Sequence, residues 1–151
     1  MPDPLTADAA IPEGFVRHFR RSGLTDPWEP IYSRRIDGTV RIGLRAAGPH
    51  ANSRGFVHGG LITALADNAM GLSCIESLGG LEAARATGLS LVTVSLSLDF
   101  LGTVRIGDWL EIRPHVLKAG QRLCFCETVV LAGDRLCARG NATFTLAKAA
   151  A

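Results

Sequence analysis

The sequence predicts one α+β domain in which an antiparallel sheet wraps around a single long central helix. Residues 59–78 are apolar, rich in Ala and Leu and poor in β-branched residues, which favours a helix over a strand. From residue 87 onward the chain instead alternates apolar and polar residues in runs that are separated by short turns. A helix that is hydrophobic around most of its circumference can be covered only by a sheet that curls around it.

Residues 1–30 are expected to form an extension, and residues 31–148 the domain itself. Within the extension, the stretch GFVRHFRR at 14–21 suits a short basic helix with a solvated face. The segments IYSRRI and TVRIGLRA follow on either side of Asp37-Gly38, a pair favoured in two-residue hairpin turns. Because the second segment alternates with period two, we expect a half-buried hairpin here.

The remaining predicted strands come after the helix. Gly79-Gly80 is expected to end the helix, because glycine is common just past a helix C-terminus. The run VTVSLSLDF then puts Val92 and Phe100 on one face and Thr93 and Ser95 on the other, polar face. Three further runs, WLEIRPHVLK, RLCFCETVVLA and RLCARGNATFTLA, are joined by short turns, so the chain predicts four consecutive antiparallel strands.

The composition argues against several classes of protein. The chain has 151 residues, a formal net charge of +2, 20% charged and 47% hydrophobic residues, which is typical of a globular domain and does not suggest nucleic-acid binding. Its four cysteines lack zinc-site spacing and are expected to be reduced and buried. The N-terminus lacks the layout of a secretory signal, so we expect a cytoplasmic protein. The one candidate membrane segment, residues 59–78, contains Asp67 and Asn68, which argues against a membrane span.

The long helix carries two features that suggest chemistry. Gly59-Gly60 at its start leaves backbone N–H groups open, and such a helix end can hold a carbonyl oxygen as it becomes an oxyanion. Asp67 lies in the middle of the apolar run, where a buried carboxylate needs hydrogen-bond partners or a catalytic task. Its neighbours three and four residues away are mostly small, which leaves room for a cleft. Alternatively, the glycines serve only a tight loop entry and Asp67 belongs to a structural network.

Gly59 and Asp67 cannot both act on one atom within a single chain. They are eight residues apart, which is about 12 Å along a helix. If two copies pack their central helices antiparallel about a twofold axis, Gly59 of one copy approaches Asp67 of the other, and two identical sites form. The chemistry therefore predicts a homodimer.

The pattern Asn52-x5-HGG-x6-Asp67, with its continuation LADNAMG, resembles the hotdog-fold acyl-CoA thioesterases of the phenylacetate-pathway (PaaI) type. The resemblance continues through VTVSLSLDFLGTVRIGD and HVLKAGQRL to LCARGNATFTLA, and it covers residues 31–146. It implies a hotdog fold and hydrolysis of an aromatic, short-chain or medium-chain acyl-CoA. It also implies no metal or other cofactor, with coenzyme A present only as part of the substrate. A homodimeric active site is implied too, with dimers pairing into a homotetramer.

The resemblance also implies roles for individual residues. Asp67 corresponds to the acid that activates water or attacks the thioester carbonyl, and Gly59 corresponds to the oxyanion donor. Gly60 lets the acyl group pass, while Asn52 and His58 orient the substrate around the carbonyl. Taken without the motif, His58 is more typical of a hydrogen-bonded structural histidine.

Other assignments rest on fewer observations. Thr93 falls where the family often carries a hydroxyl residue that holds the attacking water. Alternatively, Thr93 has only a structural role, as is usual for a threonine in a strand. Asn68 of the opposite subunit and Phe56 are expected in the walls of the substrate pocket. The turn LKAGQRL contains candidate contacts for the phosphates of coenzyme A: Lys118, Gly120 and Arg122. Alternatively, these are ordinary exposed residues of a hairpin.

Two other functions remain open from the sequence: a hotdog dehydratase or hydratase of acyl thioesters, and a non-catalytic regulator that binds acyl-CoA. Hotdog dehydratases usually pair a catalytic histidine with an acid, whereas the HGG arrangement directs a backbone donor at the substrate. A regulator is expected to carry a DNA-binding domain, and the stretch before residue 31 is too short for a helix-turn-helix unit. The acyl group, and the choice between nucleophile and general base for Asp67, are left open by the sequence.

Overall fold

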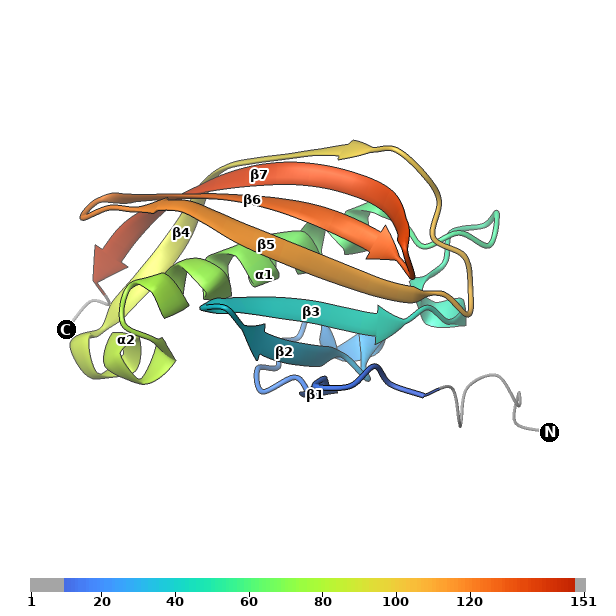
Figure 1. Ribbon diagram of the computed structural model, residues 1–151, viewed down its shortest axis with the longest axis horizontal. Helices are drawn as coiled ribbons and strands as arrows, with labels where there is room; N and C mark the ends of the chain where they lie inside the picture. The colour runs from blue at the N-terminus through green and yellow to red at the C-terminus, as the bar shows by residue number, and fades with distance from the viewer. Residues whose placement is uncertain (1–9, 149–151) are drawn as a thin grey trace.

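A single antiparallel sheet curves around helix α1, as the sequence predicts (Figure 1). The computed structural model describes residues 10–148. The helices in this part of the chain are α1 (Gly59–Ser77) and α2 (Leu81–Thr87), and two 3₁₀ turns are η1 (Asp26–Trp28) and η2 (Gly48–His50). The strands are β1 (Val16–Arg17), β2 (Tyr32–Ile36), β3 (Thr39–Arg45), β4 (Leu89–Phe100), β5 (Trp109–Ala119), β6 (Leu123–Ala132) and β7 (Arg135–Lys148).

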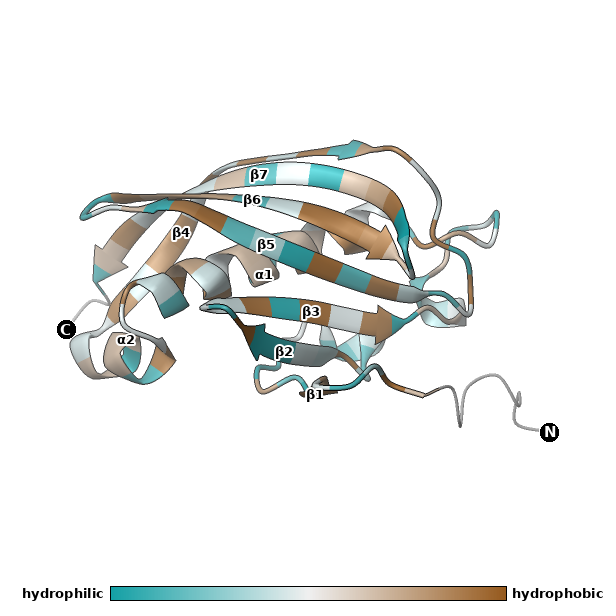
Figure 2. Cartoon of the chain, viewed as in Figure 1, coloured by the Kyte–Doolittle hydropathy of each residue, from teal (hydrophilic) through white to brown (hydrophobic). Residues whose placement is uncertain are grey.

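The strand order in the sheet is β1-β2-β3-β5-β6-β7-β4, and all neighbours are antiparallel. Hydrophobic and hydrophilic residues alternate along β3 and β5, as Figure 2 shows. The apolar members of this alternation meet α1, and the core forms where Leu44, Leu110 and Val130 of the sheet pack with Leu65 and Met70 of the helix. Burial of these side chains fixes α1 along the concave face of the sheet.

The predicted hairpin between β2 and β3 is confirmed. Asp37 and Gly38 both have positive φ, 52° and 73°, which is the backbone of a tight turn that matches the twist of paired strands. On β3, Val40 and Ile42 are buried, as the alternation predicts. The hydroxyl of Ser73 in α1 accepts a hydrogen bond from the N–H of Val40 at 3.0 Å, so this hairpin is joined to the helix by a polar contact as well as by packing.

Strand β4 is not placed as the sequence order suggests. Only β5, β6 and β7 form a meander, and β4 pairs with β7 at the far edge of the sheet. The connection between β4 and β5, residues 101–108, crosses the end of the sheet instead of making a hairpin turn (Figure 1). As a result, β4 is a long edge strand with one side of its backbone not paired by any other described strand.

A β-bulge in β4 changes which face Thr93 occupies. The register between β4 and β7 shifts between Thr93 and Ser95, so the strict alternation expected from the sequence is interrupted. Thr93 lies opposite Phe144, a buried residue, and therefore faces α1. The prediction that Thr93 and Ser95 share a polar face was wrong, because the extra residue of the bulge reverses the parity of the strand.

The central helix has the predicted ends but is not covered on all sides. Helix α1 begins at Gly59, and beyond its last turn Gly79 takes a φ of 110°, which ends it as expected. Between Gly60 and Gly71, the residues that the sheet leaves partly or fully exposed form one stripe of small and polar side chains along the helix: Gly60, Thr63, Ala64, Asp67, Asn68 and Gly71. The sheet therefore covers the apolar part of the circumference of α1 and leaves this stripe uncovered. Helix α2, which follows α1, was not predicted.

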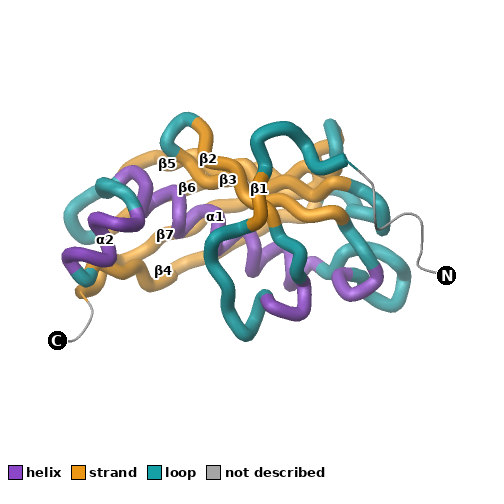
Figure 3. Tube along the Cα trace, turned by 90° about the horizontal axis from the view of Figure 1, so that it is seen from below, coloured by secondary structure: helices purple, strands orange, loops and turns teal. Residues whose placement is uncertain are grey.

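The described part of the N-terminal extension contains the 3₁₀ turn η1 but no α-helix. The expected basic helix at 14–21 is wrong: Val16 and Arg17 form strand β1, which pairs with β2, and the N–H of His18 donates to the carbonyl of Ile31 at 2.9 Å. An isolated helix of two turns is marginal in water, and hydrogen bonding to the edge of β2 replaces it. Seen from below (Figure 3), the loop after β1 runs past α1 on the side that the sheet leaves open.

Neither helix of the described region is long and apolar enough to cross a membrane.

Candidate active site

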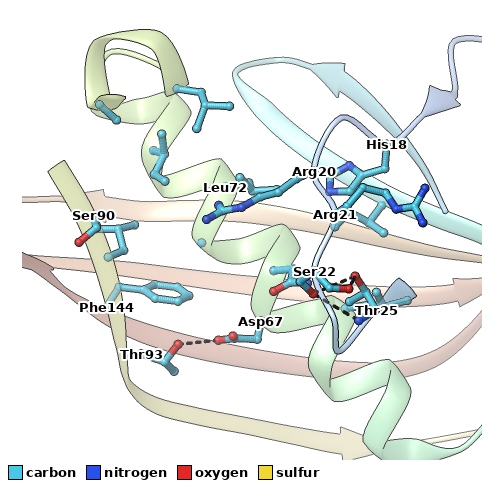
Figure 4. Close-up of a pocket in the computed structure, with 18 of the residues that line it drawn as sticks. His18, Arg20, Arg21, Ser22, Thr25, Asp67, Leu72, Ser90, Thr93 and Phe144 are labelled. Carbon is cyan, nitrogen blue, oxygen red and sulfur yellow. Dashed lines mark hydrogen bonds between the residues drawn. The ribbon is translucent and has the colours of Figure 1, made fainter. Parts of the chain in front are cut away.

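Asp67 lies at the middle of α1 and faces Thr93 of β4 (Figure 4). The hydroxyl of Thr93 donates a hydrogen bond to Oδ1 of Asp67 at 2.8 Å, an ordinary length for an O–H···O hydrogen bond. Both side chains line a pocket with a volume of about 410 Å³. Asn68 and Gly71 line the same pocket, so the space expected beside Asp67 is present.

The carboxylate of Asp67 is only half-buried, which corrects the expectation of a buried acid. The reason is that Asp67 belongs to the stripe of α1 that the sheet leaves partly uncovered. Within residues 10–148, Asp67 forms no ion pair. A carboxylate with one hydrogen-bond donor and an open oxygen can accept a proton from a molecule in the pocket.

The start of α1 is organised by His58. Its Nδ1 accepts a hydrogen bond from the N–H of Gly60 at 2.8 Å, so His58 caps the helix. A neutral imidazole that accepts at Nδ1 carries its proton on Nε2, and the exposed ring of His58 therefore presents an N–H donor. A Cβ on Gly60 would lie 2.9 Å from this Nδ1, so glycine permits the close approach.

The backbone N–H of Gly59 remains available at the helix start. It forms no hydrogen bond with any described residue, as expected for the first turn of a helix. The ring of Phe100, at the end of β4, packs beside it, since a Cβ on Gly59 would come within 3.2 Å of the ring. Gly59 and Asp67 lie eight residues apart on the same helix, about 12 Å, so one chain does not bring them together.

Asn52 shapes the loop before α1. Its side-chain oxygen accepts hydrogen bonds from the N–H groups of Arg54 at 2.9 Å and Phe56 at 3.2 Å. Phe56 pairs in turn with Arg105 through an isolated bridge. Neither Asn52 nor Phe56 lines the Asp67 pocket. Within one chain, therefore, Asn52 and Phe56 lie near the Gly59 end of α1. The side-chain oxygen of Asn52 and the backbone N–H of Phe56 stabilise the loop there.

The turn with Lys118, Gly120 and Arg122 lies at the end of the sheet opposite the start of α1 (Figure 1). Lys118 and Arg122 are exposed, and none of the three residues lines the Asp67 pocket. A Cβ on Gly120 would lie 2.9 Å from the carbonyl oxygen of Leu123, so the turn itself requires glycine. The structure thus gives Gly120 a conformational reason that is independent of ligand binding.

The pocket also receives residues that the sequence did not indicate. The segment from His18 to Thr25 lies across its open side, and Arg20, Arg21 and, from α2, Arg85 are among its lining residues. The side chains of Ser22 and Thr25 are hydrogen-bonded to each other at 3.0 Å. The basic character of 14–21 was visible in the sequence, but nothing in the local pattern showed that the loop after it folds back on α1.

The cysteines offer no nucleophile. All four are buried and free. The hydrogen bond that the Cys74 thiol donates to Cys126, together with burial, raises the pKa of Cys74 far above its ordinary range, and burial raises the pKa of Cys124 to about 12. The thiols of Cys74 and Cys124 therefore stay protonated and inert at neutral pH. Among the described residues, no group of three His, Cys, Asp or Glu side chains is arranged to hold a metal ion.

Comparison with known proteins identifies the family. Residues 54–141 match the model of the thioesterase superfamily. The chain belongs to the thioesterase superfamily. A Pseudomonas aeruginosa protein named as a candidate esterase is 38% identical over 137 residues, which cover 90% of this chain and 97% of that protein. Human acyl-coenzyme A thioesterase 13 is 30% identical over 110 residues, covering 70% of this chain and 71% of the human protein.

Solved structures confirm the fold of this thioesterase. A hypothetical thioesterase protein of Streptococcus pneumoniae, solved with coenzyme A, superposes with a TM-score of 0.68 at 21% identity, covering 82% of this chain and 94% of the other. The expected hotdog fold, with its sheet wrapped around one long helix, is confirmed. This thioesterase is accordingly a hydrolase, as predicted.

Proposed function

We propose that this thioesterase hydrolyses acyl-CoA to a free acid and coenzyme A, and that it is of the phenylacetate-pathway type. The single observation that carries the proposal is the carboxylate of Asp67, hydrogen-bonded to Thr93 at 2.8 Å and open to a pocket. Thioesters lack most of the resonance of amides, so one general base and one oxyanion donor are sufficient apparatus. The family match, the human acyl-coenzyme A thioesterase and the pneumococcal thioesterase solved with coenzyme A support the same substrate class.

In the proposed reaction, Asp67 removes a proton from a water molecule as the water adds to the thioester carbon. Thr93 holds the carboxylate in place through its hydroxyl. The carbonyl oxygen becomes an oxyanion, and the C–S bond then breaks to release coenzyme A as its thiolate, which takes up the proton. Direct attack by Asp67, followed by hydrolysis of the resulting anhydride, gives the same products.

The oxyanion donor in this proposal is the N–H of Gly59 from a second copy of the chain. A donor some 12 Å away on the same helix cannot serve, whereas an antiparallel partner helix presents its start to Asp67. Two features support such a dimer. The open stripe of small residues on α1 allows close approach of a second helix, and β4 is a long edge strand with Val92 and Val94 exposed at 53% and 60%.

Further residues complete the proposed site across the dimer. His58 would orient the substrate through the N–H at Nε2, while Gly60 leaves room for the acyl group. Asn52 would position the loop beside the carbonyl, and Asn68 and Phe56 would form walls of the pocket. The exposed turn between β5 and β6 would contact the phosphates of coenzyme A through Lys118, Gly120 and Arg122. We also propose that dimers pair into a homotetramer and that the enzyme is cytoplasmic.

The test is thiol release from a panel of aromatic, short-chain and medium-chain acyl-CoA substrates by the intact protein and two variants. Asp67→Asn is expected to lower kcat by about 10² to 10⁴, because it removes the general base but keeps the shape of the side chain. Asp134→Asn, in the exposed turn between β6 and β7, is the matched control and should retain full activity. Equal activity of Asp67→Asn and the intact protein would refute the mechanism. An active monomer in a sizing measurement would refute the shared site.

A further inference from the structure

The N-terminal segment from His18 to Thr25 gives the Asp67 pocket a positively charged side. Among the described residues that line this pocket, Asp67 is the only acid, whereas Arg20, Arg21 and Arg85 contribute three guanidinium groups. Arg21 is engaged with Asp26, to which its Nε donates at 2.9 Å. Neither Arg20 nor Arg85 forms an ion pair within residues 10–148. Two guanidinium groups therefore face the pocket without an acidic partner in that part of the chain.

The two arginines come from distant parts of the sequence and meet at the same pocket. Arg20 reaches over α1 toward Leu72, whereas Arg21 points the other way (Figure 4). Arg85 lies in the last turn of α2, the helix that follows the C-terminal end of α1. Leu72 is five residues beyond Asp67, about 7.5 Å along the helix, in the direction of α2. Both charges thus lie at some distance from the reacting carbon, at the side of the pocket toward α2.

The lining of the pocket between Asp67 and these charges includes apolar side chains from α1 and β7. Leu72 and Ile75 of α1 are buried, and Phe144 of β7 lies against Gly71. Such a surface suits a chain of methylene groups joined to the thioester carbon. The His18 ring at the edge adds no charge at neutral pH, because burial lowers the pKa of this imidazole. The positive charge therefore comes from the arginines alone.

We propose that the pocket selects acyl-CoA substrates whose acyl group ends in a carboxylate, with Arg20 and Arg85 binding that terminal carboxylate. This inference rests on the proposed thioesterase function of Asp67. Guanidinium groups bind carboxylates through paired N–H donors, and a methyl group in the same place would leave both cations without a partner. The segment that supplies Arg20 is held in position by the bond between Arg21 and Asp26 and by the contact between Ser22 and Thr25.

The experiment compares substrates of equal chain length that differ only at the far end: adipoyl-, suberoyl- and sebacoyl-CoA against hexanoyl-, octanoyl- and decanoyl-CoA. In at least one pair, the intact protein is expected to show a kcat/KM about tenfold higher for the carboxylate-ended substrate than for the methyl-ended one. A hydrogen bond between charged groups stabilises the bound substrate enough to account for a factor of this size. Arg20→Gln and Arg85→Gln should each lower kcat/KM for that substrate by about fivefold to tenfold. Both variants should leave the methyl-ended partner within about twofold.

The control is Arg17→Gln, which removes a guanidinium from strand β1, just before this segment. Arg17 pairs with Glu29 at 3.4 Å and does not line the pocket, so the ratio between paired substrates should not change. Absence of a preference for any carboxylate-ended substrate would overturn the proposal. An equal loss for both substrates of a pair in Arg20→Gln and Arg85→Gln would also overturn it, because the arginines would then bind the coenzyme A phosphates common to both.

Failure of the proposed function can be told apart from failure of this inference. If no acyl-CoA is hydrolysed at all, calorimetric binding of suberoyl-CoA and octanoyl-CoA to the intact protein replaces the kinetic comparison. Tighter binding of suberoyl-CoA that is lost in Arg20→Gln supports the inference even though the hydrolysis proposal has failed. Equal binding of the two overturns the inference as well. Thermal melting of each variant verifies that the substitution has not unfolded the domain.

Discussion

Replacement of Thr93 by valine tests how the carboxylate of Asp67 is held. Valine keeps the branched shape of threonine but cannot donate the 2.8 Å hydrogen bond to Oδ1 of Asp67. A hydrogen bond to a charged group contributes about 1.5 to 3 kcal/mol. Because Thr93 is exposed in one chain, solvent replaces part of this bond, and a loss of about 1 to 1.5 kcal/mol is expected. That corresponds to a decrease of about fivefold to 13-fold in kcat/KM.

The assay is thiol release from an acyl-CoA that the intact protein hydrolyses. It is measured for Thr93→Val, Thr93→Ser and Thr143→Val. Thr93→Ser retains the hydroxyl and should recover activity to within about threefold of the intact protein, whereas Thr93→Val should not. Thr143→Val is the matched control on β7. Thr143 pairs with Ser95, beyond the bulge, and so lies on the face of the sheet turned away from α1. Its replacement should change kcat/KM by less than about twofold.

Two results would refute this reasoning. The first is full activity of Thr93→Val together with inactivity of Asp67→Asn, because Asp67 would then need no donor from β4. The second is a loss in Thr93→Ser as large as that in Thr93→Val, because the methyl group rather than the hydroxyl would then be the important part of Thr93. Unfolding midpoints of all variants in urea separate either result from a general loss of stability.

Two predictions concern stability. Ser73→Ala leaves the buried N–H of Val40 without its 3.0 Å partner and should lower the free energy of unfolding by about 1 to 3 kcal/mol in urea titrations. As the control, Ser77→Ala at an exposed position should change the free energy of unfolding by less than about 0.5 kcal/mol. Similar values for the two variants would contradict the role of the contact between Ser73 and Val40. Burial lowers the pKa of His18 below its ordinary 6.5, so below that pH the unfolded chain binds a proton that the folded chain does not, and stability falls with decreasing pH. His18→Gln should reduce this dependence in urea titrations at a series of pH values, and an unchanged slope would contradict it.

The local patterns were sufficient for most elements of the fold. The turn pair Asp37-Gly38 predicts its hairpin because few residues accept positive φ at two successive positions, and both do so here. The extent of α1 follows from its composition and the glycines beyond its end. In contrast, the position of β4 beside β7 could not be deduced, since alternation says that a segment is a strand but not which strand it pairs with.

The bulge in β4 shows why one site residue was assigned to the wrong face. Thr93 was a candidate because of its likeness to a motif, yet strict alternation turned it away from α1. One extra residue between Thr93 and Ser95 reverses the parity, and no local feature of the sequence marks it. Asp67 was likewise a candidate from the sequence, but its half-exposed state follows from the sheet covering only part of α1.

The sequence by itself determined the central helix, the hairpin of β2 and β3, the meander from β5 to β7, and the motif that joins Gly59 to Asp67, because each depends on residues close together in the chain. Only the tertiary structure decided that β4 ends the sheet, that Thr93 meets Asp67, and that Arg20 and Arg85 share a pocket with that acid. The physical reason is that these contacts join segments far apart in sequence. Their geometry is set by burial against α1 and by strand register, which local propensity does not encode.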